Sequence, residues 1–222
     1  MTPPRAKATA DGHWRFPRGA GALSPEILRE VQRSRLFEAI CAALAEGGGY
    51  GRASVAKIVE RAGISTKTFY ELFDNKDACV LAAHRAYAEQ LGAALAEPWA
   101  GPRRWSERVR GAIAAALAYG ERAPAQLRFL LLDAPTVGPP LLAERRRAAE
   151  PLAAALREGR AEREQVAEPP PLAEEMLLAA LAWRIGAGLE DGESLAALEP
   201  PLVEFALAPY LGPESARRLA RP

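Results

Sequence analysis

Apolar residues recur every three to four positions along most of the chain, a spacing that is typical of α-helices. The first stripe runs from Leu28 to Leu44. Ser24 stands before it as a good N-cap, and Pro25 suits the first helical position. The glycine run 47–49 then ends the pattern. We therefore predict a first helix that starts at Ser24–Pro25 and ends before the glycines.

Two short helices and one long helix follow in the pattern. Ser54 can cap the first short helix, which ends at Gly63. The second spans Ser65–Phe73, with Phe69, Leu72 and Phe73 on its apolar face. The long helix spans Asn75–Glu97, with His84 on its apolar side.

Beyond Pro98 the pattern stays helical, and prolines mark the joints. We expect helices at about 103–121, 124–132, 138–160, 172–190 and 195–211. The tail after Gly212 is short and polar. No useful stretch alternates in the manner of a β-strand, so the predicted fold class is all-α.

Composition excludes several classes of protein. Apolar residues make up 49% and charged residues 26% of the 222 positions, as in a soluble globular protein. Cys41 and Cys79 sit in helical patterns, and no Cys/His spacing indicates a metal site. With no signal peptide and no long uncharged apolar run, we expect a cytoplasmic protein that does not enter the membrane. No motif calls for a cofactor.

Charge is distributed unevenly along the chain. Residues 1–76 carry 12 Lys and Arg against 8 Asp and Glu, a net charge of +4, whereas 77–222 carry 17 against 20, a net of −3. This asymmetry favours a front part that faces nucleic acid.

The segment 54–73 has the parts of a helix-turn-helix. Such a motif needs a scaffold helix, a tight turn with a small residue, and a second helix with two different faces. Gly63 supplies the turn and Ile64 anchors it. The second helix opens with the short polar residues 65–68, which allow close approach to DNA, and its N-terminal amides favour phosphate.

The sequence SVAKIVERAGISTKTFYELFDNKDACVLAA resembles the pattern of the tetracycline-repressor (TetR) family. The matching positions are Ser54, Ala62-Gly63-Ile64-Ser65, Thr68-Phe69-Tyr70, Phe73 and Lys76. The resemblance implies a three-helix DNA-binding domain joined by a long helix to a helical ligand-binding and dimerisation domain. The expected divisions are a basic arm at 1–23, the helix-turn-helix domain at 24–76 and the rear domain at 77–222.

The resemblance also implies roles for single residues. Thr66 and Lys67 sit where the family reads base edges, and Leu72 replaces a histidine that binds phosphate in many members. The remaining candidates are at phosphate-contacting positions or beside them: Arg52, Ser54, Ser65, Thr68, Tyr70 and Lys76. Hydroxyl and ammonium groups donate well to phosphate oxygens.

The N-terminal arm is a further candidate DNA contact. Arg15 and Arg18 lie among glycine and proline residues and could reach a minor groove, as other basic arms do. A disordered tail without a DNA role is the alternative.

The rear part is expected to hold an effector pocket and a dimer interface. Aromatic walls with few polar anchors are usual in ligand sites, and the candidates are Trp105, Tyr119, Phe129, Trp183 and Arg184. Each aromatic could instead be plain core, and Arg184 could be an ordinary surface residue. The resemblance places dimerisation on the helices at about 172–190 and 195–211, which could alternatively be monomer core.

These inferences predict a ligand-responsive repressor that binds a double-stranded, near-palindromic operator as a homodimer and responds to an unidentified small molecule. An activator or adaptor of the same build is the alternative, because operator position sets the sign of regulation. An enzyme is disfavoured: no catalytic motif is present, and the only histidines are His13 and His84.

Overall fold

The computed structural model describes residues 24–46, 49–101, 103–163 and 166–221, and every regular element in these ranges is helical. The chain divides into two compact units, Met1–Val80 and Leu81–Pro222. Helix α5, Lys76–Ala96, begins in the first unit and continues into the second. The predicted all-α fold class is confirmed.

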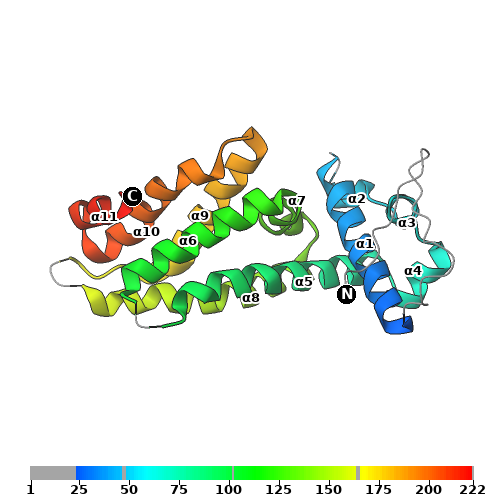
Figure 1. Ribbon diagram of the computed structural model, residues 1–222, viewed down its shortest axis with the longest axis horizontal. Coiled ribbons are helices and arrows are strands. Elements are labelled where there is room, and N and C mark those ends of the chain that lie inside the picture. The colour runs from blue at the N-terminus through cyan, green and yellow to red at the C-terminus, as the bar shows by residue number, and fades with distance from the viewer. Residues whose placement is uncertain (1–23, 47–48, 102, 164–165, 222) are drawn as a thin grey trace, which may run out of the picture. The chain divides into compact units, whose positions relative to one another are not determined.

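The N-terminal unit is a small bundle in which α1 packs on α3. Its helices before α5 are α1 (Pro25–Ala45), α2 (Gly49–Arg52), α3 (Val55–Ala62) and α4 (Thr66–Leu72) (Figure 1). The side chain of Ser24 accepts a hydrogen bond from the Ile27 amide at 3.3 Å, so α1 starts as predicted. The short helix α2 was not expected from the sequence, because its glycines argued for a break rather than a turn of helix.

Aromatic rings fill the centre of the N-terminal unit. The ring centroids of Phe37 and Phe73 lie 6.0 Å apart, as do those of Phe69 and Phe73. The guanidinium of Arg33 lies 5.1 Å from the centroid of the Phe73 ring and covers it from outside. The apolar face predicted for the second helix of the motif is therefore a packing face that fixes α4 to α1.

The C-terminal unit is built from longer helices joined by short irregular turns (Figure 1). Its α-helices after α5 are α6 (Trp105–Arg122), α7 (Pro124–Arg128), α8 (Pro139–Arg157), α9 (Ala173–Asp191), α10 (Glu199–Leu211) and α11 (Pro213–Ala220). Its connecting turns are η1 (Glu97–Trp99), η2 (Phe129–Asp133, a π-helical turn), η3 (Ala134–Thr136), η4 (Glu158–Glu162) and η5 (Leu195–Leu198).

Close packing at η4 organises this core. The indole of Trp105 donates to the Ala155 carbonyl at 2.9 Å and packs edge-on against Tyr210, with centroids 4.9 Å apart. A Cβ placed on Gly159 would lie 2.3 Å from the Trp105 ring, so only glycine fits beneath the indole.

The expectation of a polar tail after Gly212 was wrong. Pro213 opens α11 at its first turn, and Ala216 and Ala220 are buried against the core. The helical pattern of α11 is weak in the sequence, because alanine supplies most of the apolar face of this helix. No helix among the described residues is both long and apolar enough to span a lipid bilayer.

Candidate functional site

The turn between α3 and α4 has the geometry that a helix-turn-helix needs. Gly63 adopts the left-handed conformation, with φ 62° and ψ 38°. Its amide donates to the Glu60 carbonyl at 3.2 Å, and the amide of Ile64 donates to the Val59 carbonyl at 3.0 Å. These bonds close the end of α3 and reverse the chain tightly.

Helix α4 begins with a side-chain cap. The Ser65 hydroxyl accepts a hydrogen bond from the Thr68 amide at 3.0 Å and lies 2.9 Å from the Thr68 hydroxyl. Amides in the first turn of a helix have no acceptor within the helix, so those of Thr66 and Lys67 are available to an external anion.

The outward face of α4 is polar and accessible, whereas Phe69 on its inner face is fully buried. Thr66 and Lys67 are exposed, and 56% of Tyr70 is accessible. The Lys67 ammonium lies 3.8 Å from the Glu71 carboxylate, with both side chains largely in solvent. An ion pair of this kind is weak and leaves Lys67 able to reorient toward a ligand.

Two further candidates, Arg52 and Ser54, lie just before the start of α3. Arg52 ends α2 and is exposed. Ser54 is also exposed, and its hydroxyl accepts a hydrogen bond from the Lys57 amide at 3.3 Å, which caps α3. The local fold thus presents a guanidinium and a hydroxyl beside an accessible helix N-terminus.

Lys76 has a structural role that the sequence pattern did not reveal. Its ammonium donates to the carbonyls of Tyr50, at 2.9 Å, and Ala53, at 2.8 Å, and lies 3.7 Å from the centroid of the Tyr50 ring. Partial burial lowers the pKa of this ammonium. Two of its three protons hold the chain ahead of Ser54, and one remains for another acceptor.

Arg15 and Arg18 lie outside the described residues. The remaining DNA-facing candidates all belong to the segment from α2 to the start of α5, so the structure places them on one short stretch of the N-terminal unit.

The structure does not bring the five predicted pocket residues together. Trp105, Tyr119 and Phe129 are packed in the core, with at most 4% of each accessible. Trp183, by contrast, is 69% exposed. The Arg184 guanidinium pairs with Glu193 at 2.5 Å, because the turn after α9 brings this acid back toward the helix.

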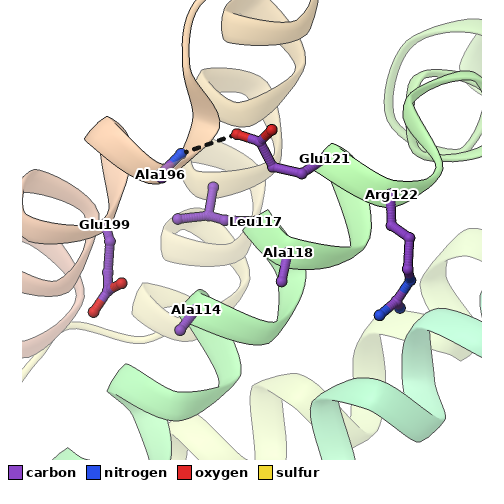
Figure 2. A pocket seen from close by; sticks show the side chains of 7 residues that line it. All are labelled: Ala114, Leu117, Ala118, Glu121, Arg122, Ala196 and Glu199. Atoms are coloured by element: carbon purple, nitrogen blue, oxygen red, sulfur yellow. Dashed lines mark hydrogen bonds between the residues drawn. The ribbon is translucent and has the colours of Figure 1, made fainter.

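An open pocket of about 480 Å³ lies instead between α6 and η5. Its floor is apolar, and Figure 2 shows the carboxylate of Glu121 directed at the start of η5, with Arg122 directed away from it. Glu121 accepts the amides of Leu195, at 3.1 Å, and Ala196, at 3.4 Å, and Glu199 pairs with Arg110 at 3.2 Å. The acids at this pocket are therefore occupied in holding the fold. No group of His, Cys, Asp and Glu within the described ranges could hold a metal ion.

Comparison with known proteins supports the interpretation of the N-terminal unit. Residues 39–83 match the family model described as bacterial regulatory proteins, tetR family. The match covers the end of α1 and all of α2, α3 and α4. No curated protein sequence matches the chain.

Solved structures share the fold over most of the chain. The FadR regulator of Bacillus subtilis, in complex with stearoyl-CoA, has a TM-score of 0.67 at 18% identity, over 79% of this chain and 97% of that chain. A TetR family regulator of Marinobacter aquaeolei has a TM-score of 0.64 at 19% identity, over 88% and 96%. LfrR of Mycobacterium smegmatis, in complex with proflavine, has a TM-score of 0.56 at 20% identity, over 79% and 96%.

These matched proteins are transcription regulators and not enzymes. On its helix-turn-helix geometry and the family model that it matches, the segment 39–83 is therefore a DNA-binding region of the tetR family, within a chain that has the helical fold of the regulators compared above.

Proposed function

We propose that the protein is a ligand-responsive repressor that binds a near-palindromic operator as a homodimer. The observation that carries the DNA-binding part is the outward face of α4, where exposed polar side chains follow a capped helix start. Residues 24–76 form the DNA-binding part in this proposal, and 77–222 form the effector and dimerisation part.

The contacts with DNA divide into two kinds. Thr66 and Lys67 read base edges, because they stand at the exposed start of α4, which enters the major groove. Other groups set the register on the phosphates and carry little sequence information; these are Arg52, Ser54, Ser65, Thr68, Tyr70 and Lys76. The Ser65–Thr68 cap already engages both hydroxyls, so phosphate contact there depends on their remaining hydrogen-bonding capacity.

An apolar face on α9 supports dimerisation. Met176 and Trp183 are 68% and 69% exposed and lie on one side of the helix, seven positions apart, and Leu172, which directly precedes the helix, is 65% exposed. Phe205 on α10 adds a ring that is 48% exposed. Large side chains grouped in this way mark contact surfaces in soluble proteins, and a twofold axis would give both protomers the same interface.

Two neighbours in fold were solved with small molecules, stearoyl-CoA and proflavine. We extend this property to the present chain as part of the proposal. Effector binding in the C-terminal unit would favour a state with lower operator affinity, and α5 would transmit the change because it belongs to both units.

The test is DNase footprinting of the full chain on DNA from upstream of its own gene, combined with a reporter in a deletion strain. The proposal predicts two protected half-sites about one helical turn apart, or slightly more, and derepression in the deletion strain. A single unpaired footprint would contradict dimeric binding, and loss of reporter expression would indicate an activator.

A further inference from the structure

On the inner face of α8, a basic side chain has no acidic partner in the described part of the chain. Arg145 is partly buried and lies one helical turn after Leu141, which is 1% exposed, so both point to the same side. The adjacent acid, Glu144, is already paired with Arg85 and with Arg147. Among the described residues, none is hydrogen-bonded to or ion-paired with Arg145.

A buried imidazole lies beside this guanidinium. His84 on α5 is 3% exposed, and its Nδ1 has no hydrogen-bond partner in the described part of the chain. The Arg85–Glu144 ion pair joins α5 and α8 at the level of His84 and Arg145, and the charge of Arg145 acts on the imidazole. Burial and the charge of Arg145 lower the pKa of His84, so the imidazole is neutral near pH 7.

Aromatic rings pack beside the imidazole. Phe129 is fully buried and its ring centroid lies 6.4 Å from that of His84 and 6.2 Å from that of Tyr87. Phe129 opens the π-helical turn η2. Such turns widen a helix locally and are frequent at functional sites.

Groups of this kind are costly unless something satisfies them. Buried polar atoms are nearly always hydrogen-bonded, and charged side chains away from water are paired. A cation, together with an unpartnered imidazole nitrogen beside aromatic rings, would be satisfied by an anion that has an apolar body.

We propose that Arg145 and His84 bind the acidic group of the effector, which is an organic anion bearing a carboxylate or a phosphate. The guanidinium of Arg145 pairs with the anion and the His84 ring donates or accepts one hydrogen bond, according to its tautomer. The apolar body lies against Phe129 and Tyr87. This inference rests on the proposed effector response and names the chemical class of the effector.

Two fluorescent probes that share an apolar body test the assignment on the full chain. Anilinonaphthalene sulfonate carries an anion, and N-phenylnaphthylamine is its neutral counterpart. Arg145→Met should weaken sulfonate binding about tenfold or more, the usual result of removing a charged partner, and leave the neutral probe within about twofold. Arg146→Met, at the exposed neighbouring position, should change neither.

A second variant and a set of competing ligands distinguish specific recognition of the anion from a folding defect. Arg145→Lys keeps the positive charge and should restore most of the sulfonate binding, which distinguishes recognition from a folding defect. Octanoate and octyl phosphate should displace the sulfonate probe better than octanol, and their order identifies the preferred acid. Absent binding by the wild type, equal sulfonate affinity in Arg145→Met, or equal loss of both probes overturns the site. Operator binding without probe is measured in parallel, and its failure overturns the proposed function instead.

Discussion

Among single residues, Lys76 combines a structural role with a proposed phosphate contact. Its ammonium joins α5 to the two carbonyls that precede α3. These acceptors lie 26 and 23 positions earlier in the chain, so no local pattern could have revealed them. By contrast, the exposure of Thr66 and Lys67 followed directly from the period of the helix and could be predicted.

Replacing Lys76 should therefore affect both stability and DNA binding. Lys76→Met leaves two carbonyls without a charged donor and should lower the free energy of unfolding by about 1–3 kcal/mol. If the third ammonium proton reaches a phosphate, the slope of log affinity against log salt should also fall by about 0.9. Urea titration and salt-dependent anisotropy measure the two effects. Lys57→Met, on the exposed face of α3, is the control for stability. Unchanged stability in Lys76→Met would refute the structural role of the two hydrogen bonds to carbonyls.

Gly63 provides a second test at this scale. An added Cβ would meet no atom within 4 Å, yet φ is +62°. Gly63→Ala should thus cost about 1–2 kcal/mol from backbone conformation alone, seen as a lower urea midpoint. Gly51→Ala, also without a neighbour within 4 Å but lacking a positive φ, should not be destabilised. Equal urea midpoints for the two variants would show that the positive φ at position 63 does not require glycine.

Among the elements, α8 and α9 each carry an arginine whose surroundings the sequence pattern did not indicate. Arg184 was a candidate for the effector pocket because it interrupts an apolar helix. In the structure, Glu193 folds back and pairs with it. Arg145 was not among the pocket candidates, because it stands in a run of three arginines and such a run normally faces solvent. Its inward direction depends on how α8 packs, which composition does not disclose.

The exposed face of α9 predicts the oligomeric state. Trp183→Glu places a charge where the proposed interface is apolar and should shift the protein from a dimer toward the 23.8 kDa monomer. Light scattering after size exclusion measures the mass. Leu142→Glu changes an apolar side chain that is 38% exposed on α8 and should leave the dimer intact. A Trp183→Glu protein that stays dimeric would exclude this face.

A buried ion pair joins η4, α9 and α10. Glu174 is 2% exposed, accepts from Arg160 at 2.8 Å, and accepts from the Tyr210 hydroxyl at 3.0 Å. The hydrogen bonds from Arg160 lower the pKa of Glu174 below its ordinary value of 4.5. Its contribution to stability is therefore complete above that value and is lost as pH falls through the depressed pKa.

Glu174→Gln should remove this contribution and leave Arg160 without its main partner, at a cost of about 3 kcal/mol. Urea titrations between neutral pH and pH 3 should show a smaller loss of stability on acidification in the variant than in the wild type. Parallel pH profiles for the two proteins would contradict the assigned role.

For the molecule as a whole, the sequence indicated the class of fold and the helix proposed to read DNA, because both depend on local periodicity, caps and one turn glycine. Of the proposed effector site it indicated only Phe129, since the rest depends on which faces of α5, α8 and η2 meet. The helix α11 was also not predicted, because alanine gives little contrast in hydrophobicity between its two faces.

Sequence-specific binding is proposed to depend on the start of α4. Anisotropy titrations of the full chain should compare the footprinted operator with a random duplex of equal length, for the wild type and for Thr66→Ala with Lys67→Ala. We predict that the wild type prefers the operator by about a thousandfold or more, and that the double variant loses most of this preference while it still binds random DNA. An unchanged preference in the double variant, or no preference in the wild type, would contradict the account.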